Sequence, residues 1–262
     1  MRVATERPID EGDRMLYRAI ATDYDGTLAE DGAVHPDVIA ALEAFRAAGG
    51  KTLLVTGREL DELLTVCNCI TLFDRVVAEN GAVLYTPLPE PAVERLLAPR
   101  IGPAFSEALI ARGVGPISCG RTIVATWEPH QHAVLDVIKE QGLELDVIFN
   151  KGAVMVLPTG INKATGLNAA AEELGLDPKT IIGIGDGEND HSLFEACGLG
   201  VAVANAVPAL KDRADFITTG ERGRGVIELA KRMLANDLPE SRSAPRVTSA
   251  RVEEEIPDSR VS

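Results

Sequence analysis

Short apolar runs alternate with amphipathic segments along the first third of the chain. Residues 18–22, 51–55 and 75–78 are apolar runs typical of buried strands. Between the first two runs, a segment with apolar residues at helical spacing opens at His35 and Pro36, and proline is common at the first position of a helix. Strands that alternate with helices indicate parallel β-α-β units.

The pattern changes near residue 86. Residues 129–141 have helical spacing, whereas residues 122–126, 146–149 and 153–157 read as strands, the last two joined by a hairpin turn. This order favours a small α+β domain with an antiparallel sheet.

From Lys163 the β-α-β pattern returns, with strands expected at 180–184 and 201–203 and a last helix at 225–234. The predicted fold class is therefore α/β: a Rossmann-like core with a parallel sheet and a small inserted α+β domain. We assign the segments as follows: an N-terminal extension at 1–16, the α/β core at 17–85 and 159–236, the inserted domain at 86–158, and a disordered tail at 237–262.

Composition and charge narrow the class of protein. The chain has 262 residues, 45% of them hydrophobic, and a formal net charge of −14. Such a charge repels phosphate backbones and anionic membranes, so we expect neither nucleic acid nor membrane partners. The four cysteines, Cys67, Cys69, Cys119 and Cys197, are scattered as free thiols of a reducing compartment would be, which predicts a cytoplasmic location.

Two acidic segments follow apolar strands. Asp23 and Asp25 come directly after the first strand, and Asp186 and Asp190 follow the strand at 180–184. Asp-Gly is also a common turn dipeptide, so the first segment taken alone has a structural explanation. Ligands of open α/β sheets bind at the carboxyl ends of the strands, where clustered carboxylates repel one another unless a cation neutralises them. Mg²⁺ suits oxygen ligands of this kind.

Three further features of the sequence bear on the chemistry of the site. Gly183 and Gly185 begin a dinucleotide-binding fingerprint, but Glu188 stands at its final glycine position, so we reject that interpretation. Thr56 and Gly57 follow the second strand, where a hydroxyl and free amides can bind an anion. Lys163 could be a solvated surface charge, but it stands where the chain re-enters the core.

Together these segments resemble the haloacid dehalogenase superfamily, in particular its Cof-type phosphatases. The superfamily pattern is D-x-D-G-T, then Ser or Thr, then Lys, then G-D-G-x-N-D, and all four parts occur here in this order. The matching segments are Asp23-Tyr24-Asp25-Gly26-Thr27, Thr56, Lys163 and Gly185-Asp186-Gly187-Glu188-Asn189-Asp190, with Asn80-Gly81-Ala82 and Val203-Ala204-Asn205-Ala206 as further Cof-type matches. The inserted domain then corresponds to the α/β cap of these phosphatases.

The resemblance implies a role for each core residue. Asp23 is implied as the nucleophile that forms an aspartyl-phosphate and as a metal ligand. Asp25 is implied as the acid and base, which leads us to expect a buried side chain, and its backbone carbonyl as a metal ligand. Thr56 and the Gly57 amide are implied to hold the phosphoryl group.

The other core motifs complete this set. Lys163 is implied to bridge Asp23 and the phosphate, and Asn189 to orient the phosphate. Asp186 is implied as a Mg²⁺ ligand, and Asp190 as one that acts largely through water.

The expected function is therefore a Mg²⁺-dependent hydrolase of a small soluble phosphomonoester, with phosphoglycolate or a sugar phosphate as first candidates. A phosphosugar mutase and a non-catalytic binding module on the same fold are the alternatives. The motif residues are expected to contact only the phosphoryl group and the metal ion. Selectivity for the rest of the substrate must therefore come from the cap. Arg121 and Lys151 are the cap cations that we expect to contact substrate.

Overall fold

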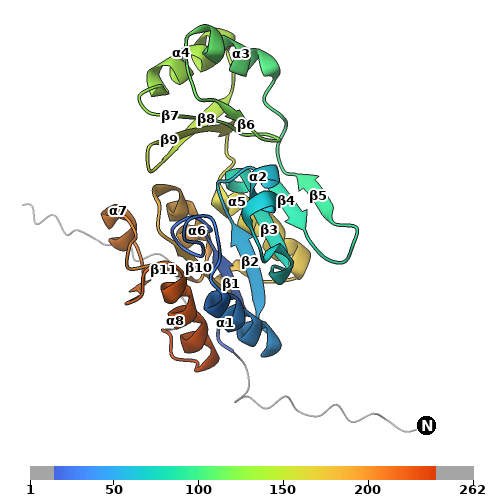
Figure 1. Ribbon diagram of the computed structural model, residues 1–262, viewed down its shortest axis with the longest axis vertical. Coiled ribbons are helices and arrows are strands. Elements are labelled where there is room, and N and C mark those ends of the chain that lie inside the picture. The colour runs from blue at the N-terminus through green and yellow to red at the C-terminus, as the bar shows by residue number, and fades with distance from the viewer. Residues whose placement is uncertain (1–14, 240–262) are drawn as a thin grey trace, which may run out of the picture.

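The computed structural model describes residues 15–239 as two stacked domains, a larger lower one and a smaller upper one (Figure 1). The expected N-terminal extension, apart from residues 15 and 16, and the expected disordered tail, apart from residues 237–239, lie outside the described residues. No helix within residues 15–239 is long and apolar enough to cross a membrane.

An eight-stranded sheet forms the centre of the larger domain. Its strands are β1 (Ala19–Thr22), β2 (Lys51–Val55), β3 (Arg75–Ala78), β4 (Val83–Thr86), β5 (Val93–Leu96), β10 (Ile181–Gly185), β11 (Leu199–Ala202) and β12 (Phe216–Ile217). Their order is β12-β11-β10-β1-β2-β3-β4-β5, parallel from β12 to β3 and antiparallel from β3 to β5. The strand order reverses at β1, which pairs with both β2 and β10, so a ligand site is expected at its carboxyl end.

Helices cover both faces of this sheet, which confirms the predicted Rossmann-like α/β core. One face packs against α1 (Pro36–Ala47) and α8 (Gly223–Leu234), and the other against α5 (Lys163–Leu174) and α6 (His191–Ala196). Two shorter helices, α2 (Leu60–Val66) and α7 (Pro208–Lys211), complete this domain. Strand residues of β1 alternate between the two cores, with Ile20 in one and Ala19 and Ala21 in the other.

The smaller domain is a four-stranded antiparallel sheet with helices on its outer face (Figure 1). Its elements are α3 (Pro103–Ala111), β6 (Ser118–Cys119), β7 (Val124–Trp127), α4 (Gln131–Gln141), β8 (Leu145–Asn150) and β9 (Ala153–Pro158), with strand order β6-β7-β9-β8. Successive side chains of a strand point to opposite faces of the sheet. Val154 and Val156 pack with α3 and α4, whereas Met155 and Leu157 belong to the cluster that includes Ala82 of the larger domain.

The start of the smaller domain differs from the expected boundary at residue 86. The chain first forms β5, which pairs with β4 at the edge of the large sheet. All four β5 residues are exposed, so the strand lacks the buried alternating pattern that predicts one. The proline-rich segment at 87–91, which resembles a linker, is instead the connection of a hairpin. The second domain therefore begins after Leu96.

Candidate active site

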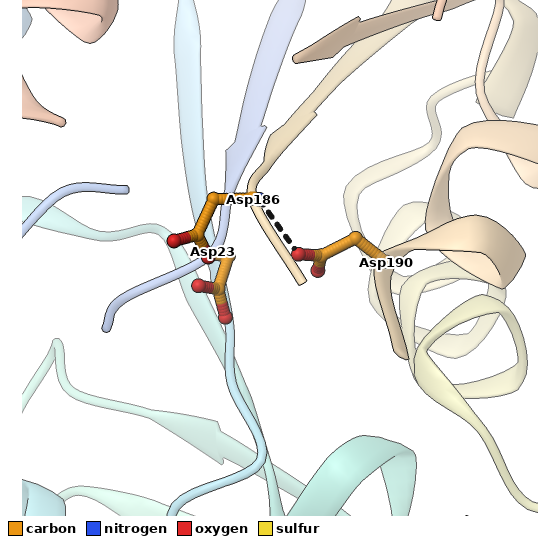
Figure 2. Close-up of side chains that lie close together, drawn as sticks. All are labelled: Asp23, Asp186 and Asp190. Carbon is orange, nitrogen blue, oxygen red and sulfur yellow. Dashed lines mark hydrogen bonds between the residues drawn. The ribbon is translucent and has the colours of Figure 1, made fainter. Parts of the chain in front are cut away.

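Three buried carboxylates meet at the carboxyl ends of β1 and β10. Asp23 follows β1, Asp186 follows β10, and Asp190 closes the short turn η4 (Glu188–Asp190). Their exposed fractions are 6%, 3% and 0%, and a carboxylate oxygen from each lies within 4.8 Å of the others. Figure 2 shows the side chains of Asp23 and Asp186 side by side, with Asp190 reaching toward them from the adjoining turn. The sequence-predicted acidic motifs are thus brought together.

Lys163 lies between two of these carboxylates. Its side chain is fully buried, and its Nζ donates to Oδ1 of Asp23 and to Oδ1 of Asp190, each at 2.6 Å. Lys163 is the first residue of α5, whose capping residue Asn162 accepts hydrogen bonds from two backbone amides of the first turn. The helix cap therefore fixes the position from which the ammonium reaches the acidic cluster.

Burial and mutual repulsion set the electrostatics of the cluster. Burial opposes the charge of Lys163, but Asp190 and Asp23 together raise its pKa above the ordinary value. Burial raises the pKa of Asp23 to about 7, against the attraction of Lys163. Burial also raises the pKa of Asp186, against the attraction of Lys151. Burial is thus the main cause of both raised carboxylate pKa values, and the attraction of the two lysines only partly opposes it.

The donor set fits a hard divalent cation. Asp23, Asp186 and Asp190 offer oxygens that are close enough to share one ion, and the backbone carbonyl of Asp25 faces the same point, where Lys151 contacts it. Oxygen ligands in small number, with room for a phosphate oxygen, are what Mg²⁺ takes in phosphate-handling sites.

Asp190 also braces the loop that carries Asp186. Its Oδ2 accepts hydrogen bonds from the backbone amides of Asp186 and Gly187, both at 2.9 Å, and Figure 2 marks the first of them. Gly185 allows this approach, because a Cβ at that position would lie 2.4 Å from the Asp190 carboxyl carbon. Since Oδ1 is bound by Lys163, both oxygens of Asp190 already accept from the protein. These hydrogen bonds fit an indirect role for Asp190, in which it acts on an ion through water instead of as a direct ligand.

Asp25 is held differently from the expected buried acid. Its side chain is 47% exposed, and Arg58 binds it through Nε and Nη2 at 2.6 and 2.7 Å. The expectation of a buried Asp25 is therefore wrong, because its side chain lies at the open interdomain cavity, where it pairs with Arg58. Arg58, for which we predicted no role, directly follows the predicted Thr56-Gly57 segment, which was the available signal.

Thr56, Gly57 and Asn189 line one cavity of about 600 Å³ together with Asp23 and Asp25. The Asn189 side chain is 8% exposed, and its Nδ2 donates to Oδ1 of Asn80 at 3.0 Å. Gly57 passes close to it, since a Cβ there would lie 3.4 Å from Nδ2 of Asn189. The motif residues that the sequence assigned to the phosphoryl group thus face the same space.

The cap forms the opposite wall of this cavity, and much of that wall is apolar. The cap residues that line it are Pro116, Ile117, Ser118, Ile123, Ala125, Thr126, Trp127, Asn150, Lys151, Ala153 and Met155. The Thr126 hydroxyl donates to the backbone carbonyl of Pro116. Lys151 is the one charged residue that the cap contributes to this wall within the described part of the chain.

Lys151 lies where the sequence placed a substrate contact, at the β8–β9 turn. Its Nζ donates to Oδ2 of Asp186 at 2.6 Å and to the backbone carbonyl of Asp25 at 3.5 Å. Its own backbone amide donates to Glu188 at 3.1 Å. The cap cation therefore reaches through the cavity to the acidic cluster of the core.

Arg121 lies elsewhere. It is absent from the lining of the cavity, and its guanidinium binds Asp61 through two N–H groups and Glu94 at 3.2 Å. These partners belong to the core domain, so Arg121 ties the cap to the core. The expectation that it contacts substrate does not agree with this position. The sequence showed only a cap cation, and the residues that neutralise it are distant in the chain.

Glu79 is an interdomain contact that sequence reasoning missed. The residue is completely buried, and its carboxylate accepts hydrogen bonds from the backbone amides of Arg121, Thr122 and Ile123 at 2.7, 2.7 and 3.1 Å. The Thr122 hydroxyl also donates to it. A core side chain thus fixes the cap loop that leads into β7. A lone glutamate before Asn80 gives no sequence signal for such a role.

Asn205 joins two loops of the site. Its Nδ2 donates to the backbone carbonyl of Gly26 at 2.8 Å and to Oδ2 of Asp186 at 3.2 Å. The segment at 203–206 stood out in the sequence, but no role was assigned to it. The structure shows that Asn205 holds the β1 and β10 loops together.

Comparison with known proteins identifies the class. A family model of haloacid dehalogenase-like hydrolases matches residues 20–113 and 133–229. The chain is 33% identical over 234 residues to a phosphoglycolate phosphatase of Natronomonas pharaonis, covering 84% of this chain and all of the relative. It is 31% identical over 238 residues to a phosphoglycolate phosphatase of Methanopyrus kandleri, covering 82% of this chain and 96% of the relative.

Solved structures agree on the fold. A Thermoplasma acidophilum protein superposes with a TM-score of 0.71 at 19% identity, covering 83% of this chain and 98% of that one. The chain belongs to the haloacid dehalogenase-like hydrolases, as its four motifs predicted. Within that family it is a Cof-type phosphatase, a phosphomonoester hydrolase.

Proposed function

We propose that this chain is a Mg²⁺-dependent phosphatase that hydrolyses a small soluble phosphomonoester through an aspartyl-phosphate on Asp23. The single observation that carries the proposal is the buried Lys163 ammonium, 2.6 Å from both Asp23 and Asp190, beside an acidic cluster that faces the interdomain cavity. Phosphoglycolate, the substrate named for the relatives, and a sugar phosphate are the first candidates. A cytoplasmic location stays a prediction.

The first half-reaction transfers the phosphoryl group to the enzyme. A carboxylate oxygen of Asp23 attacks phosphorus, the bond from phosphorus to the ester oxygen breaks, and Asp25 gives a proton to that leaving oxygen. Asp23 and Asp186 would hold Mg²⁺, with Asp190 acting through water. An ion held there would offset the repulsion between the carboxylate and the phosphate. Lys163 offsets the same repulsion from the buried side.

The second half-reaction releases phosphate. Asp25 accepts a proton from a water molecule that attacks phosphorus, and the bond between phosphorus and the Asp23 oxygen breaks. Asp23 is regenerated as a carboxylate and Asp25 is again protonated, so the cycle is balanced. Thr56, the Gly57 amide and Asn189 orient the phosphoryl group in both steps.

Phosphate release from p-nitrophenyl phosphate and from a panel of phosphate esters, with and without Mg²⁺, tests this function. We expect turnover that depends on the metal and disappears when a chelator removes it. The matched control is Asp23→Asn, which keeps the size of the side chain and removes the nucleophile. Absence of turnover on every ester at any metal concentration would overturn the proposal.

A further inference from the structure

Lys151 binds the oxygens that the proposed function assigns to a metal ion. Its Nζ is 2.6 Å from Oδ2 of Asp186 and 3.5 Å from the carbonyl oxygen of Asp25. A divalent ion ligated by Asp186 and by the carbonyl of Asp25 would lie against this ammonium, and like charges at that range repel each other. The ion and the ammonium of Lys151 therefore compete for these oxygens.

The Lys151 side chain can leave Asp186 without a movement of the backbone. The Lys151 side chain is 40% exposed, whereas that of its partner Asp186 is 4% exposed. The carboxylate is therefore fixed by the packing around it, and the ammonium is free to move into solvent or the cavity. The turn that carries Lys151 is held to the core by its backbone amide, which donates to Glu188. The side chain can thus swing while the turn stays in place.

Once released from Asp186, the ammonium lies beside the cap wall of the cavity. The cavity wall beside it is formed by Trp127, Ala153 and Met155, which offer no anion, and no acidic residue of the described cap lines the cavity. Asp25, Glu59 and Glu62 line the core side of the same cavity, and Arg58 already binds the first and the last of them. A carboxylate on the leaving group of the substrate would give the released ammonium a partner at the cap wall.

The polar groups of the cap wall also favour one class of leaving group. A sugar carries several hydroxyls, each of which needs a hydrogen-bond partner when buried. The wall offers few side-chain partners besides Lys151: Ser118, Asn150 and Thr126, whose hydroxyl already donates to Pro116. A short leaving group with a single carboxylate needs one cation and otherwise tolerates apolar contact.

We infer that Lys151 is an internal competitor of the metal ion which, when displaced from Asp186, selects phosphate esters whose leaving group carries a carboxylate. This inference rests on the proposed function, since it concerns the same site. It separates the two substrate candidates, favouring phosphoglycolate-type esters over sugar phosphates. It also makes substrate selection depend on prior occupation of the metal site.

Metal binding without substrate is the first test. Isothermal titration of Mg²⁺ into the full chain should give a Kd about two- to fivefold lower for Lys151→Met than for wild type, the range expected for losing a partly exposed ion pair. Lys139→Met, which removes the same charge from an exposed cap position of α4, should leave Kd unchanged. A residue with a merely structural role would weaken metal binding when replaced. An equal or higher Kd for Lys151→Met overturns the inference.

Substrate discrimination is the second test. The ratio of kcat/KM for phosphoglycolate to kcat/KM for 2-hydroxyethyl phosphate, its neutral analogue of the same size, isolates the carboxylate. Lys151→Met should lower this ratio about ten- to a hundredfold, the effect of one charged hydrogen bond, and Lys151→Arg should restore part of it. An unchanged ratio in an active enzyme overturns the inference alone, whereas failure of all variants on every ester overturns the proposed function.

Discussion

The core and the cap each send one lysine to the same acidic cluster, and the two lysines are held in opposite ways. Lys163 of the core is completely buried between Asp23 and Asp190, and a helix cap fixes its backbone. Lys151 of the cap is 40% exposed and contacts Asp186 from a turn. A buried ion pair with short contacts on both sides is preorganised, whereas a half-exposed one is exchangeable. From this comparison we expect the core to carry the chemistry and the cap to carry the substrate selection.

Removal of the nucleophile should have the largest effect on this arrangement. Asp23→Asn should reduce kcat by roughly 10⁴-fold or more, because an amide neither attacks phosphorus nor replaces the carboxylate charge. The measurement is steady-state turnover of p-nitrophenyl phosphate, with circular dichroism to show that the variant is folded. A folded variant with near-normal kcat would place the nucleophile elsewhere.

Loss of the buried lysine should cost stability as well as activity. Lys163→Met leaves Asp23 and Asp190 buried without their shared cation, so we expect the free energy of unfolding to fall by about 3–5 kcal/mol. Lys151→Met is the matched control, since its half-exposed pair contributes only about 0–1 kcal/mol. Denaturant titration in metal-free buffer measures both. Equal losses in the two variants would contradict the difference between core and cap.

The proposed role of Asp25 predicts an effect that depends on the leaving group. Asp25→Asn should slow hydrolysis of an alkyl phosphate by about 10²–10⁴-fold, the usual contribution of general acid–base catalysis. The loss should be smaller for p-nitrophenyl phosphate, whose leaving oxygen needs no proton. Rates over a series of esters with different leaving-group acidities give the comparison. A uniform loss across the series would remove the acid role.

The contact between the domains should have a smaller effect, confined to stability and cap position. Glu79→Gln replaces one acceptor oxygen by an amide that faces backbone N–H donors, so we expect a loss of about 1–3 kcal/mol. Glu94→Gln is a suitable control, because Glu94 contacts Arg121 at a partly exposed position. Denaturant titration monitored by Trp127 fluorescence follows the cap. If the two variants unfold alike, Glu79 does not hold the cap loop.

The sequence predicts the position of a polar residue well where that residue directly follows an apolar strand. Asp23, Thr56, Asp186 and Asp190 each follow an apolar strand, and parallel strands bring their carboxyl ends to one edge. Lys163 lies at the start of α5, as its position in the sequence predicted. The interrupted α/β pattern likewise identified the inserted domain.

The remaining features depend on partners that are distant in the chain. Arg121 reads as a cap cation, and only the fold shows that Asp61 and Glu94 neutralise it. β5 is an exposed edge strand, so hydrophobic alternation gives no sign of it. Asp25 shares its motif with Asp23, yet the pairing with Arg58 makes its surroundings different.

Direct capture of the covalent intermediate tests the central claim, that the core edge performs phosphoryl transfer through Asp23. The full chain would be mixed with Mg²⁺ and phosphoglycolate or p-nitrophenyl phosphate, quenched in acid during turnover, digested and mapped by mass spectrometry. The account predicts a phosphorylated peptide whose modified residue is Asp23, absent from Asp23→Asn and from samples without metal. Steady turnover with phosphate on another residue, or with none on Asp23 at any quench time, would contradict it.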